Sequence, residues 1–177
     1  MLIGAWVNMI KLIEDYKCYR EGILAQGFWA LQFYRFGALR FGFKSKLLRY
    51  PIAAIYILLS KFSQIFFGIY IGANAKIGRR LTIEHFGSIV LHNKVVIGDD
   101  VIIRQGVTIG NKSLDAPNSV PTIGNRVSIG AGAKILGGIT IGDDVQIGAN
   151  AVVISDIPSN SIAVGVPALI KSRTLKV

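Results

Sequence analysis

Aliphatic residues recur at every sixth position through the second half of the chain, with two interruptions. The repeated positions are Ile71, Ile77, Ile83, Ile89, Ile97, Ile103, Ile109, Ile123, Ile129, Ile135, Ile141, Ile147 and Val153. Glycine follows most of them, and a second small or aliphatic residue stands four places after many of them. A period of six matches neither the 3.6 residues of an α-helical turn nor the alternation of a long strand. Fixed short periods of this kind are typical of a β-helix.

The residue types around each repeated position suit the coils of a β-helix. The aliphatic residue can point into a stacked interior, and Ile and Val favour strands. Glycine, asparagine and aspartate tolerate the backbone angles of the corners. Three edges close a triangular coil, and coils stack through parallel backbone hydrogen bonds. We therefore predict a mainly β fold, with a parallel β-helix over residues 71–177 behind an α-helical segment at residues 1–70.

The six-residue repeat is interrupted twice. Ile89 and Ile97 are eight residues apart, which places two extra residues around positions 92–96. Ile109 and Ile123 are fourteen residues apart, which is one repeat plus eight residues. The polar, turn-rich stretch 111–121 should therefore loop away from the prism, and loops on a rigid scaffold commonly carry binding and catalysis.

The first seventy residues contain no six-residue period, few glycines and many aromatic and basic side chains. We predict helices at roughly residues 8–19, 23–41 and 52–67. The segment 52–59 is strongly apolar, but Lys61 soon interrupts it, so it falls short of the ~18 apolar residues expected of a membrane-spanning helix. The segment also lacks the basic region and small-residue cleavage site of a signal peptide.

Two interpretations of residues 1–70 stay open. In the first, the helices pack on each other and on the prism and help it to trimerise. In the second, they form a basic, aromatic-rich surface in peripheral contact with anionic lipid, because nine lysines and arginines stand there against three acidic residues. Nucleic acid explains the net charge of +10 less well, since the basic residues form no known binding motif.

The composition favours an oligomer in a reducing compartment. Apolar residues make up 51% of the chain and charged residues 17%, so much surface must be hidden in subunit contacts, as in a homotrimer. Cys18 is the single cysteine and cannot form an internal disulfide, which fits the cytoplasm. Only two histidines are present, His85 and His92, too few for a zinc enzyme with three histidine ligands, and we predict no metal.

Three stretches of the repeat carry a family resemblance. They read IEHFGSIVLHNKVVIGDDVIIRQGVTIGN, IGNRVSIGAGAKILGGITIGDDVQIGANAVV and VGVPA. They make residues 71–173 similar to the hexapeptide-repeat acyltransferases and, within these, to the serine acetyltransferase group. The likeness is greatest to small members that O-acetylate sugars in exopolysaccharide, capsule or colanic acid synthesis. The resemblance implies a left-handed β-helix, a homotrimer and acetyl-CoA as co-substrate.

The resemblance also implies the catalytic residues. Acetyl transfer to a hydroxyl needs a general base, and the family position matches His85, preceded by the acidic Glu84. Neighbouring residues on a strand point to opposite faces, so Glu84 either acts through a neighbouring subunit or binds the acceptor instead. His92 matches no catalytic position of the family and is expected at the surface or facing the acceptor. No activated Ser or Cys is visible, so we expect direct transfer without an acyl-enzyme.

The same resemblance implies a coenzyme A site between two prisms. Backbone contacts to pantetheine are implied at three turns, formed by Gly110 and Asn111, Gly130 and Ala131, and Gly148 and Ala149. Lys171 and Arg173 are candidates for the adenosine phosphates, and Lys134 could assist them.

One departure from the family decides the predicted acceptor. Serine acetyltransferases carry an Arg and a His just before a Pro in the inserted loop, where this chain has Ser119, Val120 and Pro121. The loss of these cations weakens L-serine as the acceptor, because its carboxylate loses a partner. We therefore predict O-acetylation of a sugar hydroxyl in exopolysaccharide synthesis, in the cytoplasm at the inner face of the membrane. The alternatives are a serine O-acetyltransferase of cysteine biosynthesis and a purely structural β-helix.

Overall fold

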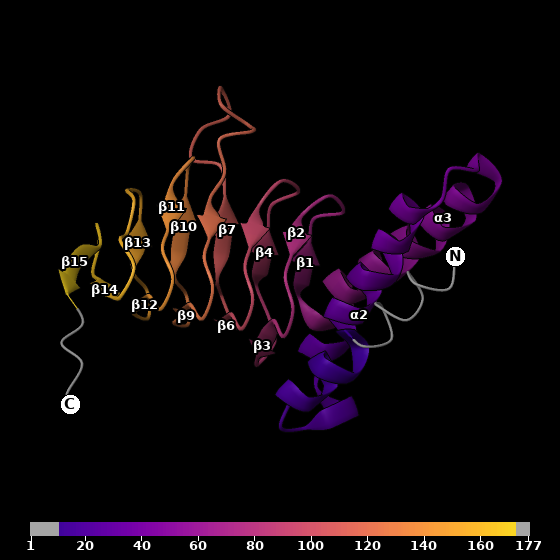
Figure 1. The fold of residues 1–177 in the computed structure, drawn as a ribbon, viewed down its shortest axis with the longest axis horizontal. Coiled ribbons are helices and arrows are strands. Elements are labelled where there is room, and N and C mark those ends of the chain that lie inside the picture. Colours follow the sequence, from indigo (N-terminus) through magenta and orange to yellow (C-terminus); the bar gives the residue numbers. More distant parts are fainter. Residues whose placement is uncertain (1–10, 173–177) are drawn as a thin grey trace.

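The computed structural model describes residues 11–172 as a three-faced prism of short strands, closed at one end by helices (Figure 1). The first face contains β1 (Ile69–Ile71), β4 (Ile89–Leu91), β7 (Thr108–Gly110), β10 (Lys134–Leu136) and β13 (Val152–Val153). The second face contains β2 (Lys76–Ile77), β5 (Val96–Ile97), β8 (Thr122–Ile123) and β11 (Thr140–Ile141). The third face contains β3 (Thr82–Glu84), β6 (Ile102–Arg104), β9 (Ser128–Ile129), β12 (Gln146–Ile147), β14 (Ser161–Val164) and β15 (Leu169–Ser172). The predicted parallel β-helix is confirmed.

The core is a set of stacked aliphatic columns inside the prism. Ile83 pairs with Ile103, which pairs with Ile129, and every repeated aliphatic position of the sequence is buried. Burial of each such side chain contributes about 2 kcal/mol of hydrophobic free energy. The last coil is covered by β15, which pairs antiparallel with β14, whereas the strands before β15 pair in parallel.

The first interruption of the repeat lies earlier than the sequence suggested. Leu91, not Ile89, occupies the stacked position, because it pairs with Ile71 in the preceding coil and with Ile109 in the next. Ile89 and Leu91 are both fully buried, so the hydrophobic pattern alone cannot distinguish which of them continues the six-residue repeat. The expectation of extra residues at 92–96 is therefore wrong.

The two extra residues lie at the corner between β3 and β4. Glu84 pairs with Arg104, and Val90 pairs with Thr108. Six positions separate Glu84 from Val90, whereas four separate Arg104 from Thr108. The longer path is residues 85–88, the corner that begins with the predicted general base.

The second interruption lies where the sequence placed it. Residues 111–121 connect β7 to β8 and project from the prism as the longest excursion of the chain between two strands (Figure 1). Ile97 pairs with Ile123 and Ile109 pairs with Ile135, so the coil on either side of the loop keeps its register. Leu114 at the loop is 91% exposed.

The helical segment has the predicted class but different boundaries. Residues 11–18 are helical, and the remaining elements are η1 (Gly22–Leu24), α2 (Gln26–Ala38), η2 (Leu39–Gly42), α3 (Lys46–Phe62) and the π-helical η3 (Ser63–Phe67). Helix α3 begins six residues before the predicted start at residue 52, with Pro51 inside it. Proline usually opens a helix, which is why the pattern pointed to 52. Residues 8–10 of the first predicted helix lie outside the described part of the chain.

Side chains of the helical segment cap the open end of the β-helix. The first coil has no preceding coil to accept or donate backbone hydrogen bonds, and unpaired buried backbone groups are costly. Hydroxyl and guanidinium groups bond its carbonyl oxygens instead: Ser63 to Ile69 (2.9 Å), Tyr56 to Ile71 (3.0 Å), Arg40 to Ala73 (2.9 Å), Tyr34 to Ala75 (2.5 Å), Arg35 to Gly78 (2.9 Å) and Tyr19 to Leu81 (3.2 Å). These contacts attach the helices to the prism along its whole first coil.

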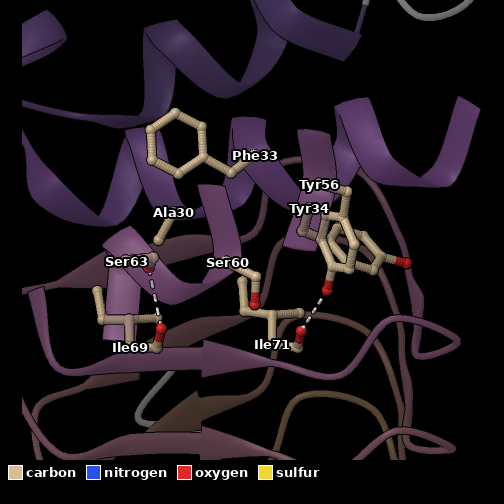
Figure 2. Close-up of a pocket in the computed structure, with 8 residues that line it drawn as sticks. All are labelled: Ala30, Phe33, Tyr34, Tyr56, Ser60, Ser63, Ile69 and Ile71. Atoms are coloured by element: carbon tan, nitrogen blue, oxygen red, sulfur yellow. Dashed lines mark hydrogen bonds between the residues drawn. The ribbon is translucent and has the colours of Figure 1, made fainter. Parts of the chain in front are cut away.

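A small cavity lies between the helices and the first coil. Figure 2 shows the Tyr56 and Ser63 hydroxyls pointing from the helical side toward the carbonyls of Ile71 and Ile69. The cavity has a volume of about 10 Å³, which accommodates no more than one water molecule. It is a packing gap of the cap, and neither histidine lines it.

Replacing Tyr19 by Phe tests the cap. The Tyr19 hydroxyl donates to the Leu81 carbonyl and accepts from the Ile83 amide at 3.1 Å, so Tyr19→Phe leaves two buried backbone groups unpaired. We expect the free energy of unfolding in urea to fall by about 2 kcal/mol. Tyr16→Phe, which removes the hydroxyl of a half-exposed ring in the helix just before Tyr19, is the matched control and should change stability little. Equal losses for both variants would contradict the capping role.

Candidate functional site

Two edges of the prism carry the residues that the sequence singled out. The histidine edge joins the third face to the first and comprises residues 85–88, 105–107, 130–133 and 148–151. The turn at residues 165–168, between β14 and β15, stacks on its end through hydrogen bonds with Val152. The loop edge joins the first face to the second and comprises residues 72–75, 92–95, 111–121, 137–139 and 154–156. Backbone hydrogen bonds stack each corner on its neighbour, as in Gly132 to Gln105 (2.8 Å) and Gly137 to Gly110 (2.9 Å). Each edge is therefore a continuous ridge along the molecule.

His85 stands at the irregular corner of the histidine edge. His85, Gly87 and Ser88 have φ angles of 64°, 105° and 54°. Left-handed backbone recurs at other corners of the prism, including Asp100, Arg126 and Asn150, so the two extra residues distinguish this corner more than its φ angles do. The His85 side chain is exposed, and within residues 11–172 it makes no hydrogen bond. Its imidazole is therefore available to an external ligand.

Glu84 lies beside His85 but is bound to another residue. Its carboxylate lies 2.9 Å from Nε of Arg104, on the next strand of the third face. Both side chains are about 40% exposed, so the pair contributes little to stability. Between positions 11 and 172 the structure has no hydrogen bond from Glu84 to His85. The corner thus presents an exposed imidazole, and the strand that leads into it carries Glu84 of the Glu84 and Arg104 ion pair.

His92 lies on the loop edge, and its ring is hydrogen-bonded within its own corner. Its Nδ1 accepts a hydrogen bond from the Lys94 amide at 3.2 Å, and its own amide donates to the Ile109 carbonyl at 2.9 Å. With Nδ1 used as an acceptor, the neutral ring carries its proton on Nε2 and offers a donor to the outside. This tautomer does not suit a general base, which agrees with the preference for His85.

The predicted coenzyme A turns fall on both edges. Gly130 and Gly148, with Ala131 and Ala149 after them, stack on the histidine edge, where the Asn150 amide donates to the Ala131 carbonyl at 2.8 Å. A Cβ on Gly130 would lie 2.5 Å from the Ala149 nitrogen, so glycine is required there by packing.

The remaining coenzyme A turn lies apart from these two. Gly110 ends β7, and Asn111 begins the longest segment of the loop edge, next to His92. The Asn111 side chain donates to the Ser113 carbonyl at 2.8 Å and so shapes the start of the loop. One chain therefore brings two of the three turns together, and the third lies at another corner of the prism.

The predicted basic residues are also dispersed. Lys134 lies on β10, where its ammonium donates to the Gly106 carbonyl at 2.5 Å and to Thr108 at 3.2 Å. It is thus held within the prism wall. Lys171 lies exposed on β15, at the end of the prism away from the helices (Figure 1). Arg173 lies outside the described residues.

Arg104 is the residue that the sequence reasoning missed. Glu84 and Arg104 occupy the third position of consecutive strands on one face, so they are separated by one coil. An alignment of the chain by coils, with the two extra residues assigned to 85–88, would have placed them side by side. No group of three His, Cys, Asp or Glu able to hold a metal occurs within residues 11–172.

Comparison with known proteins gives consistent results. The profile of the bacterial transferase hexapeptide (six repeats) matches residues 121–155. A serine acetyltransferase of Helicobacter pylori is 52% identical over 110 residues, which cover 62% of this chain and 64% of that protein. One of Staphylococcus xylosus is 47% identical over 110 residues, which cover 62% of this chain and 51% of that protein.

Solved structures agree with these relatives. The structure of Neisseria gonorrhoeae serine acetyltransferase superposes with a TM-score of 0.82 at 30% identity, covering 96% of this chain and 67% of that one. A serine acetyltransferase in complex with CoA gives a TM-score of 0.72 at 36% identity, covering 83% and 57% of the two chains.

These findings correct the predicted acceptor. The chain spans about two thirds or less of the length of the curated relatives that it matches, and these relatives are serine acetyltransferases. The prediction of sugar O-acetylation in exopolysaccharide synthesis is therefore wrong, and the similarity favours its alternative. The prediction depended on a few positions of the inserted loop before Pro121. The similarity to serine acetyltransferases, by contrast, extends over 110 residues.

Proposed function

This chain belongs to the hexapeptide-repeat acyltransferases, and we propose that it is an acetyl-CoA-dependent serine O-acetyltransferase. The main support is the corner at His85, where two extra residues and left-handed backbone hold an exposed imidazole that makes no internal hydrogen bond. The names of the relatives and of the structural neighbours supply the acceptor and the acyl donor.

In the proposed reaction His85 acts as the general base. One imidazole nitrogen takes the proton of the L-serine hydroxyl while the hydroxyl oxygen attacks the thioester carbonyl carbon. A carbon–oxygen bond forms, and the carbon–sulfur bond of acetyl-CoA breaks. The imidazolium then returns its proton to the departing thiolate, which leaves O-acetylserine and free CoA. No acyl-enzyme is required in this mechanism, because the acceptor hydroxyl attacks the thioester directly.

The acyl donor lies along the histidine edge in this proposal. Ala131 and Ala149 point their small side chains outward there, so a pantetheine arm can approach the backbone closely. Gly110 and Asn111 lie on a different edge and reach the same ligand only from a neighbouring copy in a cyclic trimer. Lys171 and Arg173 remain our candidates for the adenosine phosphates.

Arg104 supplies the positive charge that L-serine requires in this proposal. The inserted loop lacks a cation before Pro121, but the Arg104 guanidinium lies beside Glu84 at the His85 corner. A guanidinium binds a carboxylate through paired, charge-assisted hydrogen bonds. Glu84 holds Arg104 in place and stays available for the α-ammonium group of the acceptor. Both charges of the amino acid thus have a partner next to the base.

A thiol-release assay with acetyl-CoA and L-serine tests this proposal. We expect turnover by the wild-type chain and a fall of kcat on the order of a hundredfold or more in His85→Asn, because the general base is removed. His92→Asn is the matched control and should keep most of the activity, since its ring is bound to the Lys94 amide.

Two results would reject the proposal. One is background thiol release with L-serine for the folded wild-type protein, which would exclude this acceptor. The other is an acetylated protein intermediate trapped in the absence of acceptor, which would exclude direct transfer.

Substitution of Arg104 tests the binding of the acceptor carboxylate. Arg104→Gln should raise KM for L-serine by about tenfold and leave KM for acetyl-CoA unchanged, because only the carboxylate partner is lost. The preference for L-serine over serinol, which lacks the carboxylate, should fall to the same extent. Arg126→Gln removes an exposed, ion-paired arginine at a different corner of the prism and serves as the control. An unchanged preference in Arg104→Gln would place the carboxylate elsewhere.

Enlarging Ala149 tests the donor site. Its side chain is exposed on the histidine edge, so Ala149→Trp should be tolerated by the fold and obstruct the pantetheine arm. We expect KM for acetyl-CoA to rise roughly tenfold or more, since a displaced donor loses its reactive alignment. KM for L-serine is the internal control. A normal KM for acetyl-CoA would move the donor away from this edge.

A further inference from the structure

Helix α3 and the following η3 expose an unusual amount of apolar surface. We define the α3 face as the exposed large apolar residues of these elements, which are Leu47, Leu48, Tyr50, Ile55, Ile57, Leu58, Phe62, Ile65 and Phe66. Leu47 is 82% exposed, Leu58 71% and Ile65 75%. Contiguous apolar surface of this kind usually marks an interaction site. The α3 face forms no part of the proposed catalytic site.

The charges around the α3 face have one sign. Lys44, Lys46 and Arg49 surround its beginning, Lys61 interrupts it, and all four are exposed. From residue 22 to residue 83 the chain has nine lysines and arginines and no acidic residue. An apolar helix face bordered by lysine and arginine is the pattern of a helix that lies in the headgroup region of a membrane. Each such cation adds attraction to anionic lipid.

The opposite side of the helix packs against α2 and is attached to the prism near its C-terminal end. Tyr56 and Ser63 are buried, and their hydroxyls donate to the carbonyls of Ile71 and Ile69 in the first coil (Figure 2). Within residues 11–172, Lys46–Phe67 is the one helical stretch whose length and hydropathy would suit a membrane crossing. A helix docked on a protein surface along one side presents only its other side to lipid. Its geometry therefore favours lying on the membrane over crossing it.

We propose that the α3 face binds the surface of an anionic lipid bilayer, with α3 parallel to the membrane plane. The apolar side chains enter the headgroup boundary, and Lys44, Lys46, Arg49 and Lys61 meet the lipid phosphates. Two α3 faces packed against each other fit less well, because they would bring like charges together with no acidic residue from 22 to 83 to balance them. In Figure 1 the helices project from one end of the prism, so the rest of the prism lies to one side of the α3 face.

Sedimentation of the full chain with lipid vesicles tests this inference. We expect binding to phosphatidylcholine vesicles that contain about 30% phosphatidylglycerol, weak binding to phosphatidylcholine alone, and a loss of binding as salt rises. Leu47→Glu combined with Leu58→Glu should weaken binding by about tenfold or more, because both charges fall within the apolar contact. Leu114→Glu combined with Leu169→Glu is the matched control: it makes the same charge change at leucines that are 91% and 67% exposed on the prism, and should bind normally.

Three results would overturn the inference. One is that the substitutions do not act selectively: the wild type and the α3 variant bind vesicles equally, or the control variant loses as much vesicle binding as the α3 variant. Another is a smaller oligomer for the α3 variant in light scattering, with unchanged vesicle binding, which would make the face an interface between copies. The third is retention of the wild-type chain in cell membranes after alkaline carbonate washing, which would indicate a crossing helix. Since none of these measurements involves acetyl transfer, their outcome is independent of the proposed activity.

Discussion

The backbone hydrogen bonds at the open end of the prism are the constraint on which the structure depends. Within the prism, the backbone N–H and C=O groups of each coil pair with those of the next coil. The first coil has no coil before it, and an uncovered sheet edge can pair with other chains. This protein covers that end with tyrosine, serine and arginine side chains from its helices, not with another strand. The buried Asp15 and Arg35 pair secures the cap, since Arg35 bonds both Asp15 and the Gly78 carbonyl. Breaking a buried pair of this kind costs about 3–5 kcal/mol.

The cap also joins the proposed catalytic site to the helical segment. The Tyr19 hydroxyl bonds the backbone of Leu81 and Ile83, on either side of the start of β3, the strand that ends at Glu84. Disturbing the helix therefore disturbs the strand that delivers His85 to its corner. A similar dependence holds at the start of the first face, where the Ser63 hydroxyl of η3 bonds the first residue of β1.

The architecture was predictable from the sequence because each coil repeats the same physical requirement. An aliphatic residue in every strand and a permissive residue at every corner define the β-helix without reference to distant contacts. The helix boundaries and the position of the first insertion were less accessible. Pro51 gives the local signal of a helix start although α3 begins at Lys46, and Ile89 competes with Leu91 for the stacked position. Arg104 was missed since its partner becomes visible only when coils are aligned in register.

The two extra residues at positions 85–88 and the eight that the loop at 111–121 adds both lie at corners of the prism, and neither lies within a strand. A corner can lengthen without changing the alternation of inward and outward side chains in the strands on either side of it. A few added residues can therefore give a regular structural coil a projecting imidazole while the coils beyond it keep their packing. The same rule indicates how a β-helix of this type can gain or lose a reactive site during evolution at little risk to its fold.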